Sequence, residues 1–248
     1  MTTIASTHNP KLKALRRLQT KRGRAAERRF LVEGEDLVAA AVSAGRPALE
    51  GYRLAGSNLG DDSFFDVERS ALGSVSTLGS STRVIAVYEQ RWDSAVGPLC
   101  VYLHGVSDPG NVGTILRSAA AFGASCVAFG PGCADPHSPK AVRASMGAIF
   151  AVPIAWIADP AGLPGERIAL DAGAQETLRG PAGEQEQAVT LLIGAEREGL
   201  PAEVIAASDR VARIPIVTES LNAAMAATVA LYEMTRRGGR DHDTVSAS

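Results

Sequence analysis

The chain has 248 residues and a net charge of −2, and it is 46% hydrophobic and 21% charged, a composition typical of a soluble globular protein. No apolar run approaches the roughly 18 residues that a membrane span needs, and the N-terminus lacks the apolar core of a signal peptide. A cytoplasmic protein without a membrane partner is therefore expected. The three cysteines lack C-x-x-C spacing, which predicts reduced thiols and no metal site.

Positive charge is concentrated at the N-terminus. Residues 1–30 hold nine Lys and Arg and a single acid, and residues 9–24 are predicted to form one helix with leucines on one side. Because neutralising phosphates releases counterions, such a segment indicates a surface for a nucleic-acid backbone. A solvated basic helix explains the same charge, and the lack of interleaved aromatic residues argues against base stacking here.

The rest of the N-terminal part is predicted to be a small α/β unit. Short strands are expected at 30–32, 52–55 and 83–88, with a helix at 35–43. A linker follows at 89–98, so residues 1–95 are expected to form the first domain.

After Pro98, apolar runs alternate with helical patterns. This alternation predicts a parallel sheet covered on both faces, in a second domain of residues 96–238. The polar residues 239–248 are expected to be a flexible tail. The expected strands are 99–106, 125–129, 151–156, 167–171, 189–194 and 211–216, and the expected helices are 111–123, 139–146, 201–207 and 221–237.

Candidate functional residues follow four of these strands. This is where they are expected, because ligands of open α/β sheets bind beyond the carboxyl ends of the strands. After the first, Asn111 is expected to cap a helix in which small residues surround Arg117. A surface arginine on an Ala-rich helix is the simpler interpretation of that stretch alone. Further along, Lys140 and Arg143 share one face of a helix, for which a solvated helix is an equal alternative.

The last two strand ends differ in chemistry. Gly194-x-Glu196-x-x-Gly199 allows close backbone approach to a ligand, and its acids suit a positively charged ligand better than a phosphate. The final strand leads to a helix rich in alanine, which suits a dimer interface or simple helix propensity. Residues 168–174 partly match the Asp-x-Gly-x-Gly loop of Rossmann-type methyltransferases, but Gln175 stands where a further glycine is wanted.

Three of these segments together resemble the motifs of the SpoU/TrmH family of RNA ribose 2′-O-methyltransferases, in the SPOUT superfamily. The first motif is Asp108-Pro-x-Asn111-x-Gly113-x-x-x-Arg117, and the second is Ile193-Gly194-x-Glu196-x-x-Gly199. The third is Ile214-Pro215 followed by Ser220-Leu221-Asn222. The N-terminal part resembles the substrate-binding domain of the ribosomal-RNA branch, which is related to ribosomal proteins that bind kinked RNA.

The resemblance implies a C-terminal α/β trefoil knot that binds S-adenosylmethionine, and a homodimer with active sites at the subunit interface. It implies methylation of a ribose 2′-hydroxyl, most simply in 23S ribosomal RNA. The residues assigned to catalysis are Asn111, Arg117, Glu196 and Asn222. Those assigned to the cofactor are Leu192, Gly194, Ile214 and Leu221, and those assigned to RNA are Lys11, Lys13, Arg16, Arg17, Lys140, Arg143 and Ser145.

Two alternatives stay open. The first is the same chemistry on tRNA, against which the N-terminal domain argues. The second is a catalytically silent RNA-binding or assembly factor, against which the four intact catalytic positions argue. The family often has a serine two residues after Asn222, and Ala224 excludes a catalytic hydroxyl at that position.

Overall fold

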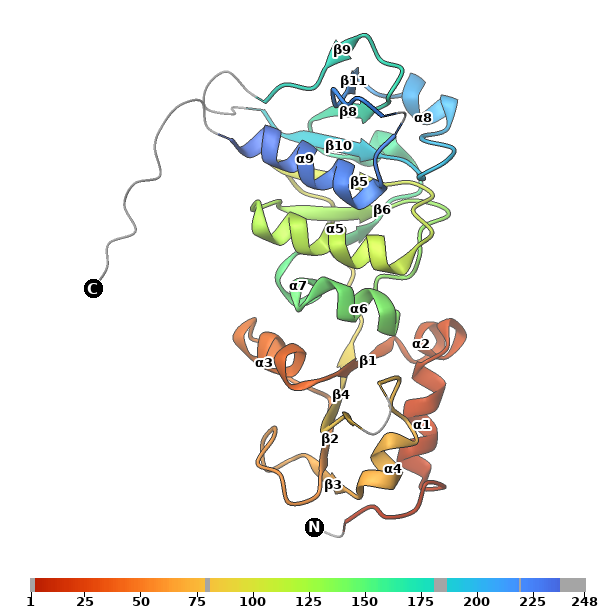
Figure 1. Ribbon diagram of the computed structural model, residues 1–248, viewed down its shortest axis with the longest axis vertical. Helices are drawn as coiled ribbons and strands as arrows, with labels where there is room; N and C mark the ends of the chain where they lie inside the picture. Colours follow the sequence, from red (N-terminus) through yellow and green to blue (C-terminus); the bar gives the residue numbers. More distant parts are fainter. Residues whose placement is uncertain (1–2, 79–80, 181–186, 219, 237–248) are drawn as a thin grey trace, which may run out of the picture.

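The computed structural model describes residues 3–78, 81–180, 187–218 and 220–236, which form two sheets with their own helices (Figure 1). The expected tail at 239–248 lies outside the described residues. The N-terminal part holds a four-stranded sheet of order β1-β4-β2-β3, in which β4 is antiparallel to both its neighbours. Its elements are α1 (Pro10–Leu18), α2 (Lys21–Glu27), β1 (Arg29–Glu33), α3 (Glu35–Ser43), β2 (Glu50–Leu54), β3 (Phe65–Val67), α4 (Arg69–Gly73) and β4 (Val84–Glu89).

The basic N-terminal segment forms two helices, so the prediction of one helix over residues 9–24 was wrong. Asn9 caps α1 by accepting a hydrogen bond from the Lys11 amide at 2.9 Å. Thr20 then starts a new helix, because its hydroxyl accepts a hydrogen bond from the Gly23 amide at 3.1 Å. The apolar side of α1 is buried as its spacing predicts.

The C-terminal part is a seven-stranded sheet of order β7-β6-β5-β10-β8-β11-β9, and its neighbouring strands pair in parallel. This confirms the predicted α/β class with a parallel sheet. Its elements are β5 (Leu99–Leu103), α5 (Pro109–Ala121), β6 (Cys126–Phe129), α6 (Pro139–Ser145), α7 (Ala148–Ala151), β7 (Ile154–Trp156), η2 (Pro160–Gly162), β8 (Glu166–Leu170), β9 (Glu176–Thr177), β10 (Val189–Ile193), α8 (Ala202–Ala206), β11 (Arg210–Arg213) and α9 (Ala223–Thr235).

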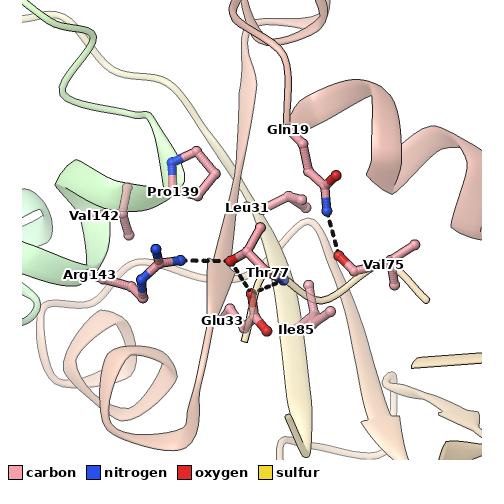
Figure 2. A pocket seen from close by; sticks show the side chains of 9 residues that line it. All are labelled: Gln19, Leu31, Glu33, Val75, Thr77, Ile85, Pro139, Val142 and Arg143. Atoms are coloured by element: carbon pink, nitrogen blue, oxygen red, sulfur yellow. Dashed lines mark hydrogen bonds between the residues drawn. The ribbon is translucent and has the colours of Figure 1, made fainter. Parts of the chain in front are cut away.

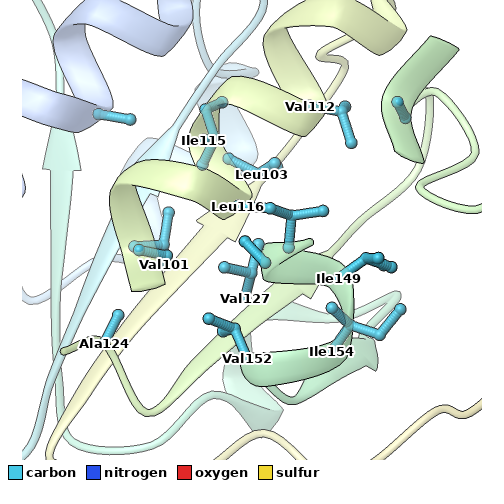
Figure 3. Close-up of a cluster of buried hydrophobic side chains, with 14 of the residues drawn as sticks. Val101, Leu103, Val112, Ile115, Leu116, Ala124, Val127, Ile149, Val152 and Ile154 are labelled. Carbon is cyan, nitrogen blue, oxygen red and sulfur yellow. The ribbon is translucent and has the colours of Figure 1, made fainter. Parts of the chain in front are cut away.

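The central strands are buried on both faces. On one face, Val101 and Leu103 of β5 pack with Ile115 and Leu116 of α5 in the cluster drawn in Figure 3. On the other face, alternate residues of the same strands belong to a separate cluster together with α8. This explains why the strands read as continuous apolar runs without alternation.

Three expected boundaries are corrected by local geometry. The strand predicted at 151–156 is shortened to Ile154–Trp156, because residues 148–151 form a helical turn, α7. β11 ends at Arg213, two residues before Pro215, which has no amide hydrogen to continue the ladder. α5 begins at Pro109, since the fixed φ of proline suits the first position of a helix.

The two sheets are joined by polar contacts as well as by apolar packing. The buried guanidinium of Arg24 in α2 lies 2.7 Å from the carboxylate of Asp135 in the loop before α6. A second contact, shown in Figure 2, links α6 to the N-terminal part: Arg143 donates to the Thr77 hydroxyl at 2.6 Å, and Thr77 donates to Glu33 at 2.8 Å. In the described parts of the chain, no helix combines the length and apolar character that a membrane crossing requires.

Candidate active site

The first turn of α5 is capped by Asp108, not by Asn111 as predicted. The Asp108 carboxylate accepts hydrogen bonds from the amides of Gly110 at 2.5 Å and Asn111 at 3.1 Å. The Lys140 ammonium lies 2.8 Å from the same carboxylate, and this hydrogen bond lowers the pKa of Asp108. Because Asp108 satisfies the helix terminus, the Asn111 side chain is free to bond elsewhere.

Asn111 connects the three motifs. Its amide nitrogen donates a hydrogen bond to the Glu196 carboxylate, and its amide oxygen accepts one from Asn222 Nδ2 at 3.1 Å. Asn222 is itself held at the start of α9, where its Oδ1 accepts from the amides of Ala224 at 2.9 Å and Met225 at 3.4 Å. Three of the four residues assigned to catalysis thus form one hydrogen-bonded chain at the carboxyl edge of the sheet.

A cleft of about 330 Å³ adjoins this chain of hydrogen bonds. Gly194 is one of the residues that line the cleft, and a Cβ at this position would lie 2.2 Å from the Gly199 carbonyl carbon and 2.3 Å from the Leu200 nitrogen. The loop therefore folds back on the end of β10 so closely that only glycine fits. The lining comprises Leu170, Asp171, Ala172, Ile193, Gly194, Ala195, Glu196, Arg197, Glu198, Gly199, Ile214, Ile216, Ser220, Leu221, Ala223 and Ala226.

The lining of the cleft contains three of the four residues assigned to the cofactor, namely Gly194, Ile214 and Leu221. The assignment of the fourth residue, Leu192, is corrected. Its side chain is fully buried in the cluster on the opposite face of the sheet and does not line the cleft. Residues 170–172 line the cleft but were absent from the predicted site. The sequence did offer a signal for them, because they lie at the carboxyl end of β8, which pairs directly with β10.

The chemistry of the cleft fits a molecule with one apolar aromatic part and one cationic part. Ile193, Ile214 and Leu221 offer apolar contact, while Glu196, Glu198 and Asp171 offer carboxylates. The volume lies within the range of ordinary ligand sites, about 300 to 1,000 Å³. S-adenosylmethionine has both parts, in its adenosine and in its sulfonium and amino groups, so the residues present fit this cofactor.

Arg117 lies apart from the other three residues assigned to catalysis. Six positions at about 100° per residue place it about 120° around the α5 axis from Asn111. Its side chain is exposed and has no hydrogen bond or ion pair to any other described residue. The small neighbours noted in the sequence therefore leave Arg117 free at the surface, about 100° around α5 from Ser118, whose hydroxyl contacts Thr228 of α9.

The residues assigned to RNA on α6 have different environments. Ser145 is fully buried and its hydroxyl donates to the Val142 carbonyl at 2.7 Å. The prediction that this side chain contacts RNA was therefore wrong. Arg143 is half-buried and held by Thr77. Lys140 is exposed next to Asp108, at the edge of the candidate site.

The four basic residues assigned to RNA in α1 also differ. Arg16 is half-buried and donates to the Thr7 carbonyl at 2.9 Å and to the Ser74 hydroxyl at 2.7 Å. Arg17 pairs with Glu27 at 2.6 Å. Lys11 lies 3.7 Å from Glu50 and 4.2 Å from the centre of the Phe65 ring. Lys13 is exposed.

The described residues contain no group of three or more His, Cys, Asp or Glu side chains placed to hold a metal ion. Among them, the cleft and the adjoining hydrogen-bonded chain Glu196–Asn111–Asn222 bring polar side chains together beside a hollow at the carboxyl edge of the parallel sheet. This arrangement defines an α/β protein with a small-molecule site at the carboxyl edge.

The chain belongs to the SpoU rRNA Methylase family, whose model matches residues 98–232. A second model, the MRM3-like substrate binding domain, matches residues 9–86. The recognition made from the three motifs is thereby confirmed.

Named relatives are methyltransferases. The uncharacterized tRNA/rRNA methyltransferase Rv0881 of Mycobacterium tuberculosis is 41% identical over 150 residues, which cover 55% of this chain. This chain spans 51% of the length of that relative. The 23S rRNA (guanosine(2553)-2′-O)-methyltransferase RlmP of Bacillus subtilis is 28% identical over 252 residues, covering 94% of this chain and 99% of RlmP.

Solved structures agree with the fold. The AdoMet-bound rRNA methyltransferase from Sinorhizobium meliloti has a TM-score of 0.82 and 30% identity, and the match covers 94% of this chain and 96% of that chain. The SpoU methyltransferase AviRb from Streptomyces viridochromogenes, in complex with AdoMet, has a TM-score of 0.79 and 27% identity, with 91% and 97% covered.

Proposed function

We propose that the protein is an S-adenosylmethionine-dependent RNA ribose 2′-O-methyltransferase. The observation that carries this proposal is the hydrogen-bonded chain of Glu196, Asn111 and Asn222 beside the cleft. Membership of the SpoU family and the AdoMet-bound structures of similar fold support it.

The cofactor is proposed to lie in the cleft. Ile214 and Leu221 would flank its adenine, the Gly194 backbone would approach it closely, and the acids would face its positive charge. When bound, S-adenosylmethionine supplies an electrophilic methyl group on a sulfonium sulfur. The protein must then position a 2′-hydroxyl in line with that methyl group.

Asn111 and Asn222 would orient the ribose, because their amides are already fixed by Glu196 and by the start of α9. Arg117 would hold the neighbouring phosphate and stabilise the negative charge that develops on the 2′ oxygen. A pKa above about 12 makes an arginine a poor proton acceptor, so an electrostatic role is preferred to that of a base.

We propose 23S ribosomal RNA as the substrate. The name of RlmP, the relative that matches along nearly its whole length, supports this choice over tRNA. The match of residues 9–86 to a substrate-binding domain model also supports it, and α1 carries the exposed cations Lys11, Lys13 and Arg17 that would meet phosphates.

A homodimer is also proposed, with α9 at the interface. Met225, Val229 and Tyr232 are spaced along one side of α9 and are 62%, 41% and 54% exposed, an apolar stripe next to the packed α5 helix. Arg117 lies about 120° around α5 from the Asn111 of its own chain, so a site that uses both side chains would need Arg117 from a second chain. Val229→Asp is expected to give monomers in sedimentation experiments, whereas unchanged dimers would contradict the proposed interface.

Two further expectations stay proposals. A knot in the C-terminal part is supported by the place of β10 between β5 and β8, and a crystal structure traced through residues 181–222 would test it. A cytoplasmic location is supported by the proposed RNA substrate, and cell fractionation would test it.

The proposed function is tested in two steps. Calorimetry with S-adenosylmethionine is expected to give one site per chain, and labelled methyl groups are expected to enter ribosomal RNA from a strain lacking the gene. Mapping of ribose methylation would then identify the nucleotide. If the protein binds S-adenosylmethionine but transfers no methyl group to any RNA, the result would favour the catalytically silent factor.

A further inference from the structure

Both tryptophans of the chain lie together on the surface, in a place the proposed site does not use. Trp92 is 40% exposed and Trp156 is 53% exposed, and their ring centres are 6.5 Å apart at 84°. We call these two side chains the tryptophan pair. A single exposed apolar side chain is ordinary, whereas adjoining exposed apolar side chains mark interaction sites.

The tryptophan pair stands on a rigid base. Trp92 packs edge to face against Phe129 at 6.1 Å and against His137 at 5.4 Å, and both of these side chains are buried. The backbone beside Trp92 is fixed as well, because the Asp93 amide donates to the Ile154 carbonyl of β7 at 2.7 Å. The rings are therefore held in place, with part of their surface open to solvent.

The pair lies at the same edge of the sheet as the candidate active site. The last residues of four adjacent strands are in lateral register, since Ile193 pairs with Leu103, Leu103 with Phe129, and Phe129 with Trp156. Three strand spacings of about 4.8 Å place Trp156 about 14 Å from the end of β10. At a stacked rise of about 3.4 Å, that distance corresponds to about four nucleotides.

Cations lie next to the pair. Arg91 precedes Trp92 in the chain, and Arg91 and Arg46 both line a hollow of about 240 Å³ that His137 also borders. Asp93 lines the same hollow and Glu89 lies 3.8 Å from Arg91, so the local charge is balanced. Stacking, with a smaller contribution from phosphate contacts, is thus the chemistry that this surface offers.

We infer that the tryptophan pair binds unpaired bases of the RNA substrate, a few nucleotides from the ribose that is methylated. Aromatic rings beside arginines are the usual stacking surface for single-stranded RNA, because every base presents a flat face. This inference rests on the proposed function only for the identity of the substrate. The pair would position the strand across the carboxyl edge without contacting the reacting atoms.

Intrinsic tryptophan fluorescence reports on this surface directly, because the chain has no tryptophan elsewhere. Titration with a short oligoadenylate is expected to quench the emission of the full chain. An abasic ribose-phosphate oligomer of equal length carries the same charge and is expected to quench it far less. Equal quenching by both oligomers, or none by either, would overturn the stacking inference.

Variants separate the tryptophan pair from the catalytic site. Trp156→Ala is expected to weaken oligoadenylate binding about tenfold, by the usual contribution of one stacked base, and to raise KM for RNA while kcat is retained. Trp156→Phe should restore most of the affinity. Leu49→Ala removes a side chain that is 47% exposed elsewhere and serves as the control.

The outcomes distinguish the inference from the proposed function. Methyl transfer by the wild type with an unchanged KM in Trp156→Ala would overturn the inference and leave the function standing. Base-dependent quenching without methyl transfer would support the pair as an RNA site and count against the enzyme. Dissociation of a dimer by Trp156→Ala, without any effect on RNA, would reassign the pair to an interface between chains.

Discussion

The side-chain amide of Asn111 donates a hydrogen bond to the carboxylate of Glu196, which lies 85 positions further along the chain. Asn222 extends this contact by donating to the other end of the same amide at 3.1 Å. Each amide is thereby fixed in one orientation, since its oxygen and its nitrogen have different partners. A fixed pair of amides beside the cleft is a means of orienting a bound hydroxyl group.

Asn111→Ala is expected to reduce kcat for methyl transfer about 100-fold, because it removes the link between Glu196 and Asn222. Asn111 is only half-buried, so the free energy of unfolding should change little. Thr114→Ala, an exposed position one turn along α5, is the matched control and should leave kcat unchanged. Equal rates of methyl transfer by the wild type and Asn111→Ala in single-turnover assays would show that Asn111 has no role in catalysis.

Much of the fold was predictable because local patterns determine it. The bounds of α3 match the prediction, since Gly34 and Gly45 flank an unambiguous helical stretch. The parallel sheet was predictable because strands buried on both faces read as apolar runs. α7 was missed, because its four residues are too few to separate a helical period from a strand.

The site was predictable in part. The motifs indicated Asn111, Glu196 and Asn222, but no spacing rule reveals that these three side chains bond to one another. Burial removed Ser145 from the surface, and the alternation of β10 turned Leu192 away from the cleft. Both corrections depend on which face a residue occupies, which packing decides.

Arg117→Ala is expected to lower kcat about 1000-fold while the affinity for S-adenosylmethionine stays nearly unchanged. The reason is that Arg117 is exposed and lies outside the cleft, so it contributes to neither folding nor cofactor contact. Arg117→Lys retains the charge but not the planar fork and should recover a small part of the rate. Loss of cofactor binding in calorimetry would instead assign Arg117 a role in the structure of the cleft.

Gly194→Ala is expected to weaken cofactor binding at least tenfold. The added methyl group would meet the backbone of Gly199 and Leu200 within 2.3 Å, so the loop that forms the cleft must move. Overpacking of this kind costs about 1 to 3 kcal/mol in the free energy of unfolding.

Gly162→Ala is the matched control for that substitution, because a Cβ at position 162 meets nothing within 4 Å. Calorimetry and denaturant unfolding of both variants provide the comparison. Unchanged affinity in Gly194→Ala, together with the expected loss of stability, would place the cofactor outside this cleft.

Arg24→Met is expected to lower the free energy of unfolding by about 3 to 5 kcal/mol, because it leaves the Asp135 carboxylate buried without its partner. Arg24 is 3% exposed, and it also donates to the carbonyls of Leu18 at 3.0 Å and Gln19 at 2.8 Å. Arg83→Met is the control, since Arg83 pairs with Glu35 at 3.0 Å but is about half exposed. Similar losses in both variants, measured by denaturant unfolding, would contradict a special role for the buried pair.

The same contact predicts how stability depends on pH. Burial alone would raise the pKa of Asp135, but hydrogen bonding to His137 and the charge of Arg24 outweigh it and lower the pKa to about 2. An unfolded aspartate has a pKa of about 3.9, so the unfolded state binds the proton first as the pH falls. The Arg24–Asp135 pair therefore stabilises the protein fully above about pH 4. Between pH 4 and pH 2 the free energy of unfolding falls by about 2 kcal/mol as this stabilisation is lost. Asp135→Asn should flatten this part of the stability profile, and an unchanged slope in acid unfolding would show that other carboxylates control it.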